Sequence, residues 1–127
     1  MMDSTTTQAP FQVIPDAWKN LPKMDEPQYA GTEGFIADVY ENPAGSVMCS
    51  GFFELKNTDE PLLYEYDYDE MKVVLEGEFL LENKETGQSM VARAKDAIFF
   101  PKGSKIYFST PSYALAFYAG HRDASLL

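Results

Sequence analysis

The stretch that decides the fold is EMKVVLEGEFLLE, residues 70–82. Apolar and acidic side chains alternate around Gly77, with Val73, Leu75, Phe79 and Leu81 set against Glu76, Glu78 and Glu82. A period of two is the pattern of a β-strand with two different faces. Residues 83–87 follow with the Asn and Gly that hairpin loops favour. This stretch therefore predicts a strand that ends in a hairpin.

The same organisation extends along the chain. Short strand patterns, separated by Gly, Pro and Asn, cover residues 35–40, 46–55, 62–68, 89–92, 97–100, 105–109 and 114–119. A strand-like run at 11–14 and at most two helical turns at 16–21 precede them, and Pro22 must end those turns. The pattern predicts an all-β, single-domain antiparallel sandwich or barrel with a short helical or irregular N-terminal segment.

Length and composition agree with one globular domain, because the chain has 127 residues, of which 45% are apolar and 24% charged. Residues 1–10 are polar and are interpreted as a disordered leader, which leaves 11–127 as the domain. The leader has neither the apolar core of a signal peptide nor an Arg-rich pattern, and no run reaches the roughly 18 apolar residues of a membrane span. We expect a soluble, cytoplasmic protein.

The charge balance excludes several classes of partner. Twenty acidic residues against ten Lys and Arg give a formal net charge of -10, which disfavours nucleic acid and anionic membranes. Eight of the acidic residues lie in residues 59–78, so a neutral substrate is favoured over an anionic one. The single His121 and single Cys49 rule out an intramolecular disulfide and any metal site with two imidazoles.

Two segments resemble the motifs of the cupin superfamily. Residues 70–78 are similar to the second half of the first motif, in which six residues separate a Glu from a Gly, and residues 95–104 to the start of the second. Within cupins the chain resembles the ethanolamine-utilisation EutQ-like group, on residues 68–70, 74–78, 101–104 and 109–112. The resemblance implies an antiparallel jelly-roll β-barrel. Lys95 stands where the second motif has Gly, so we expect that turn to be altered.

The resemblance also says where metal ligands would lie. Metal-binding cupins use a His-x-His pair, the motif Glu and a later His. These positions fall on Tyr64 and Tyr66 (or on Leu63 and Glu65 with a longer spacer), on Glu70 and on Ile106. Only Glu70 retains a ligand, and phenols with one carboxylate hold transition metals poorly. We therefore expect neither a metal nor another cofactor.

Three residues are candidates for catalysis. Glu70 would point into the barrel, where a carboxylate isolated among aromatic rings acquires the raised pKa of a general acid or base. Tyr64 and Tyr66 could donate hydrogen bonds to a carbonyl or enolate oxygen. The structural alternatives are a hydrogen-bonded carboxylate and tyrosines that simply fill the barrel.

Seven further residues are candidate substrate contacts: Glu65, Met48, Ser50, Phe100, Lys102, Tyr118 and Trp18. For the strand residues among them the choice between inner and outer face stays open. Lys102 could instead be a solvated charge at the rim, and Trp18 could pack over the barrel. Cys49 is interpreted as a small buried apolar residue and His121 as a surface residue.

Two functions from different classes follow. The first is a metal-independent enzyme of the isomerase, lyase or cyclase type, acting on a small carbonyl compound. The alternative is a non-catalytic cupin that binds a small molecule or serves as a structural subunit of a metabolic assembly. A water-filled cavity that reaches Glu70 and a tyrosine hydroxyl favours the enzyme, and a barrel plugged by Phe and Tyr side chains would contradict it.

Two more expectations concern activity and assembly. The EutQ-like group also implies acetate kinase activity, which ranks last because no Gly-rich phosphate loop precedes a helix and clamping Lys and Arg residues are few. We expect a homodimer formed through an exposed sheet edge, with residues 11–14 or the strand near Phe117 as contributors.

Overall fold

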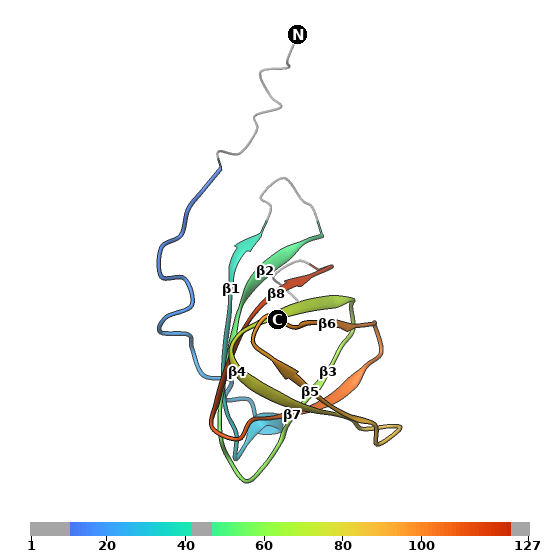
Figure 1. The fold of residues 1–127 in the computed structure, drawn as a ribbon. Helices are drawn as coiled ribbons and strands as arrows, with labels where there is room; N and C mark the ends of the chain where they lie inside the picture. The colour runs from blue at the N-terminus through green and yellow to red at the C-terminus, as the bar shows by residue number, and fades with distance from the viewer. Residues whose placement is uncertain (1–10, 42–46, 123–127) are drawn as a thin grey trace.

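The computed structural model describes residues 11–41 and 47–122, and the expected leader lies outside them. The described chain is almost entirely β-structure (Figure 1). The elements are the 3₁₀-helix η1 (Pro27–Tyr29) and the strands β1 (Glu33–Glu41), β2 (Cys49–Lys56), β3 (Leu62–Glu65), β4 (Glu70–Asn83), β5 (Ser89–Arg93), β6 (Ala97–Phe100), β7 (Lys105–Ser109) and β8 (Tyr113–Gly120).

The long strand β4 belongs to two sheets. Its first half pairs with β8 and β6, and β8 continues to β2 and β1. Its second half pairs with β5 and β7, and β7 continues to β3. Every one of these pairings is antiparallel, and the two sheets curl round a common interior (Figure 1). The predicted all-β antiparallel fold is therefore confirmed.

Two backbone positions show how the β4 region is shaped. Gly77 lies next to the irregularity in the pairing with β8 and has φ +69°, and a Cβ there would collide with the carbonyl of Tyr113. Only glycine fits such a position. Lys95 also adopts a left-handed conformation, with φ 79°, and its N–H donates to the Val74 carbonyl at 2.8 Å. The turn at Lys95 therefore has a positive φ although Lys stands where the cupin motif has Gly.

The N-terminal segment differs from the prediction. Residues 11–14 form no strand, and the Phe11 side chain is 94% exposed. Residues 15–20 make turns rather than helix, because Asp16 and Asn20 have φ values of 55° and 57° that an α-helix excludes. The helical turn that does form, η1, lies further along the chain. The segment runs along the outside of β1 (Figure 1).

Strand boundaries differ most at two places. The strand predicted for 46–55, whose first residue lies outside the described residues, begins at Cys49, and the strand predicted for 62–68 ends at Glu65. After Glu65 the backbone bonds to the turn before β7 instead. The Tyr66 N–H donates to the Ser104 carbonyl at 2.8 Å, and the Gly103 N–H donates to the Tyr66 carbonyl at 2.7 Å.

Aromatic rings pack in the interior of the barrel. Phe53, Phe79 and Phe108 pack against one another inside, with ring centroids 5.6–6.1 Å apart. Phe117 lies on β8 between β2 and β4, so its strand is not a free edge, and the suggestion that it contributes one is wrong. Within residues 11–41 and 47–122, the structure contains no helix of the length and apolarity that a membrane crossing requires.

Candidate small-molecule site

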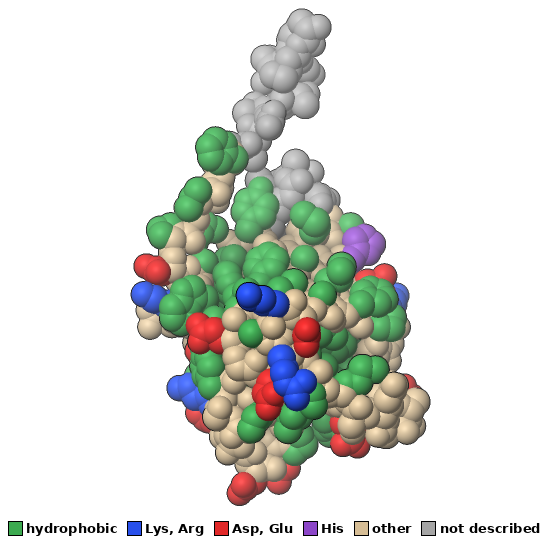
Figure 2. All heavy atoms as spheres, in the orientation of Figure 1, with side chains coloured by type: hydrophobic (Ala, Val, Ile, Leu, Met, Phe, Trp, Pro, Cys, Tyr) green, Lys and Arg blue, Asp and Glu red, His purple; other side chains and the backbone are tan. Residues whose placement is uncertain are grey.

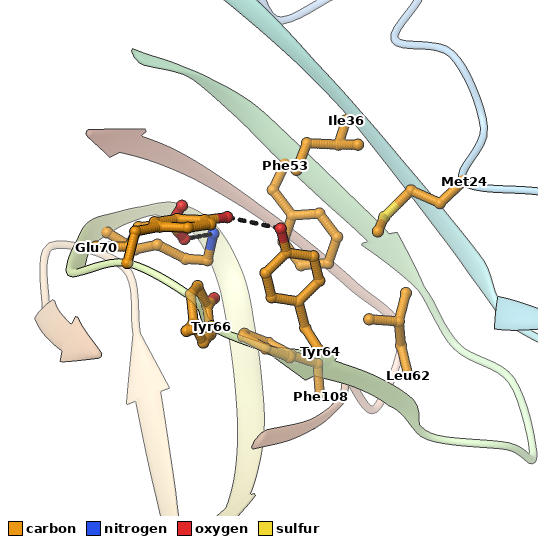
Figure 3. Close-up of a pocket in the computed structure, with 10 residues that line it drawn as sticks. Met24, Ile36, Phe53, Leu62, Tyr64, Tyr66, Glu70 and Phe108 are labelled. Carbon is orange, nitrogen blue, oxygen red and sulfur yellow. Dashed lines mark hydrogen bonds and ion pairs between the residues drawn. The ribbon is translucent and has the colours of Figure 1, made fainter. Parts of the chain in front are cut away.

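The predicted catalytic residues meet at one small internal cavity. Tyr64 from β3, Tyr66 from the following loop and Glu70 from β4 all line it (Figure 3). Leu63 and Glu65, the positions given by the longer spacer, do not line it. The cavity volume is about 10 Å³, which is room for no more than about one water molecule.

Glu70 is not the isolated carboxylate that the sequence suggested. Its Oε2 lies 2.7 Å from the Lys72 Nζ, and both side chains are only 3% exposed. Residues two apart in a strand share a face, so Lys72 enters the barrel for the same reason that Glu70 does. The alternation that placed Glu70 inside could have found Lys72. Taking two charges out of water costs several kcal/mol per ion before their attraction offsets it.

The tyrosines of the cavity contact one another and the aromatic rings around them. The Tyr64 and Tyr68 hydroxyls lie 2.6 Å apart and share a hydrogen bond, which Figure 3 shows beside the Glu70–Lys72 contact. Tyr66 stacks on Phe100, with centroids 4.7 Å apart and planes 8° from parallel. Burial and then the negative charge of Glu70 raise the pKa of Tyr66 well above its ordinary value. Burial likewise raises the pKa of Tyr64, so both phenols remain donors.

A second, larger hollow shares part of its lining with the cavity. This mouth groove has a volume of about 650 Å³, which is in the range of small-molecule sites. It shares four lining residues with the inner cavity, namely Met24, Ile36, Tyr64 and Tyr68. Its remaining polar lining is mostly acidic and includes Asp25, Glu26, Glu65 and Asp67 against one Lys23.

An ion pair near the end of the described chain supports Tyr68. The Arg122 guanidinium donates to both carboxylate oxygens of Asp38, at 2.9 and 3.0 Å, and lies 5.0 Å from the Tyr68 ring centre. The Tyr118 hydroxyl donates to the same carboxylate at 2.6 Å. Sequence analysis missed this cluster because Asp38 lies 80 residues from Tyr118 and 84 from Arg122 along the chain.

The other predicted contacts are scattered. Glu65 lines the mouth groove. Phe100 and Tyr118 are buried beside the cavity, and the centre of the Tyr118 ring lies 4.8 Å from the Lys72 Nζ. Of the rest, Trp18 borders a different hollow with Phe52, and Met48, Ser50 and Lys102 line neither the cavity nor the groove. Cys49 is buried and His121 exposed, as expected.

The residues at the metal positions do not fit a divalent metal. Tyr64 and Ile106 face each other across β3 and β7, and a hydrocarbon side chain is no ligand. The one carboxylate, Glu70, already binds the Lys72 ammonium. Within 11–41 and 47–122 no three His, Cys, Asp or Glu side chains come together in a cluster that could hold a metal ion.

Sequence comparison places the chain in a family. The family model described as ethanolamine utilisation protein EutQ matches residues 5–123. The chain belongs to the EutQ family. It is 36% identical over 111 residues to a protein of Escherichia coli (strain K12) named acetate kinase EutQ, which covers 86% of this chain and 44% of that protein. A Clostridioides difficile protein of the same name is 38% identical over 84 residues, 66% of this chain and 51% of that protein.

Solved structures agree with this assignment. The structure of a Salmonella typhimurium ethanolamine utilization protein has a TM-score of 0.69 and 30% identity, over 80% of this chain and 78% of that one. The Cnp3 cupin domain of Schizosaccharomyces pombe, at 10% identity and a TM-score of 0.59 over 73% of this chain and 67% of that one, supports the fold alone. The chain spans about half the length of the EutQ relatives that it matches by sequence.

Proposed function

We propose that this EutQ-family cupin domain takes up a small neutral carbonyl compound through the mouth groove and performs acid–base chemistry on it with Glu70. One observation carries the proposal: Tyr64 and Tyr68 line both the groove and the cavity that contains Glu70 and Lys72. Because Met24 and Ile36 line both hollows as well, movement of these shared side chains would join a groove large enough for a ligand to a buried carboxylate. The acidic lining of the groove favours a neutral compound over an anion.

The proposed reaction is proton abstraction next to the carbonyl group. Glu70 is the base that removes a C–H proton, and the electrons move onto the carbonyl oxygen. Tyr66 or Tyr64, kept protonated by its raised pKa, donates a hydrogen bond to the oxygen as negative charge develops there. Aromatic side chains fill the interior in this structure, which is the arrangement that counts against an enzyme. The reaction therefore requires Tyr64 and Tyr68 to move.

Hydrogen–deuterium exchange of a substrate tests the reaction without knowledge of the natural compound. The protein is incubated in D₂O with acetone, dihydroxyacetone or cyclohexanone, and ¹H NMR follows the C–H signals next to the carbonyl. We expect faster loss of these signals with the unmodified protein and not with Glu70→Gln. Glu76→Gln is the matched control, since it changes an exposed carboxylate of the same strand. Equal rates with Glu70→Gln would remove Glu70 as the base.

Ligand binding without chemistry is the second candidate, and the closed barrel favours it. A cavity of about 10 Å³ admits no organic substrate, whereas the groove does. In that case the same compounds would shift NMR signals of groove residues such as Ile36 and Glu65, and Glu70→Gln would bind them equally well. Binding with no exchange would identify the domain as a binding module.

Acetate kinase activity comes last. It is the activity in the names of the EutQ relatives, but a groove with four carboxylates and one lysine is a poor environment for ATP phosphates. We expect no ADP release from ATP and acetate by this chain above that of the groove variant Lys23→Met. ADP release that depends on Lys23 would make phosphoryl transfer the leading function.

A further inference from the structure

The cupin metal positions and the barrel's one buried lysine meet at Glu70. Tyr64, Tyr66 and Glu70, three of the four positions that hold ligands in metal-binding cupins, line a single cavity here. The fourth position, Ile106, lies opposite Tyr64 on the neighbouring strand. Lys72 lines the same cavity and places its ammonium 2.7 Å from the only ligand-type oxygen of the set.

The surroundings of Lys72 are those of a bound cation. The Nζ lies 4.8 Å from the ring centre of Tyr118, 5.1 Å from that of Phe53 and 5.9 Å from that of Phe108. Ring faces attract a cation that is held within about 6 Å of them. A carboxylate on one side and three aromatic rings around it therefore compensate the ammonium for its lost water.

We propose that the Lys72 ammonium replaces the divalent metal ion that metal-binding cupins hold at this point of the barrel. A metal bound to Glu70 would have to share the carboxylate with the ammonium and lie within a few ångströms of a like charge. The inner cavity, at about 10 Å³, has room for about one water molecule, so a metal ion there would lie directly beside the ammonium. Lys72 thus supplies a fixed positive charge and excludes the metal at the same time.

The replacement changes what the site can bind. The ammonium carries a single charge, which the Glu70 carboxylate balances, so the pair adds no net charge to the barrel. It offers N–H donors to a ligand oxygen instead of an open coordination position. Such a pair suits the oxygen of a neutral carbonyl or hydroxyl compound. This inference concerns metal exclusion and stands whether or not the proposed acid–base reaction occurs.

Restoring the histidines tests whether Lys72 is what keeps a metal out. The double variant Tyr64→His/Tyr66→His and the triple variant that adds Lys72→Met are titrated with Co²⁺ and followed by visible absorbance and calorimetry. We expect stoichiometric Co²⁺ binding by the triple variant and at least tenfold weaker binding by the double variant. The control Tyr64→His/Tyr66→His/Lys102→Met removes an exposed lysine and should behave as the double variant does.

The outcomes separate clearly. Equal Co²⁺ binding by the double and triple variants would overturn the proposal, because the ammonium would then not compete with the metal. Failure of both to bind would overturn it as well, since Lys72 would not be what excludes the metal. Circular dichroism shows whether each variant is folded.

A measurement on the unmodified protein covers the case in which the triple variant does not fold. A ¹H–¹⁵N NMR correlation of the lysine ammonium groups should contain one group with slowly exchanging hydrogens and a large upfield shift from the three rings. The absence of such a group would mean that no caged ammonium exists, and the proposal would fail.

Discussion

The first four residues of β4 are arranged in the reverse of what burial alone would select. Glu70 and Lys72 point inward and are 3% exposed, whereas their neighbours Met71 and Val73 point outward and are 55% and 40% exposed. A strand that served only a core would place the apolar set inside. The buried charges cost desolvation energy, which is consistent with a site inside the barrel. The apolar outer face is consistent with a contact surface outside it.

The outer face is broader than one strand. Met71 lies opposite Phe99 of β6, which is 57% exposed, and Phe52 contacts Phe117 on the strands beyond. Figure 2 shows hydrophobic side chains across the face of the molecule drawn there, interrupted by charged groups. The homodimer stays a prediction, and this face, with residues on β4 and β6, replaces residues 11–14 as the surface that we expect a second copy to cover.

Removing the charge of Lys72 should give the largest effect. Lys72→Met leaves the Glu70 carboxylate buried without its partner, and we expect a loss of about 3–5 kcal/mol in the free energy of unfolding. Glu70→Gln/Lys72→Met should recover most of this loss, because neither charge is then present. Urea denaturation followed by circular dichroism measures both. A loss that persists in the double variant would mean that Lys72 stabilises the fold by packing and not by charge.

Alkaline pH should destabilise the inner face next. The folded-state pKa values of Tyr66 and Tyr118 are raised above their ordinary value of 10.0, first of all by burial. Their contribution is therefore complete below about pH 10 and is lost as the pH rises beyond it, by about 1.4 kcal/mol per pH unit for each tyrosine. Tyrosinate absorbance should appear together with unfolding by circular dichroism. Ionisation of all tyrosines in the folded protein near pH 10 would contradict this.

Breaking the hydrogen bond between Tyr64 and Tyr68 should have a smaller effect. Tyr64→Phe removes the hydroxyl that shares a hydrogen bond with Tyr68, and we expect a loss of about 1 kcal/mol. Hydrogen exchange of the backbone amides of β3 should become faster. The matched control is Tyr107→Phe, a half-buried tyrosine of β7 that lines neither the cavity nor the groove. Equal losses of stability from the two substitutions would mean that the Tyr64–Tyr68 hydrogen bond does not stabilise this part of the barrel.

The outer face should respond least in stability. Phe99→Glu changes an exposed side chain, so the free energy of unfolding at low protein concentration should shift by no more than about 0.5 kcal/mol. Gel filtration at micromolar concentration should nevertheless change from dimer to monomer. A monomeric unmodified protein at that concentration would contradict the expected assembly.

Part of the site followed from the alternation along residues 64–68. It predicted that Tyr64 and Tyr66 share a face, and both line the cavity, but Glu65 lines the groove together with Tyr64 and does not point away from it. The same alternation places Lys72 on the face of Glu70, but the prediction treated Glu70 as a carboxylate with no charged partner. Turns were less predictable. Asp16 and Asn20 adopt positive φ values that no local pattern distinguishes from a helix start.

What the sequence by itself determined is the class of fold and the loss of the histidines. Period-two alternation with Gly and Pro punctuation specifies antiparallel strands, and a chain with one His cannot build an imidazole-rich site. Only the tertiary structure decided that Tyr64 and Tyr68 meet beside Glu70 and that Asp38 meets Arg122. These contacts depend on strand register and on pairs up to 84 residues apart, and such distances are fixed only when the sheets close.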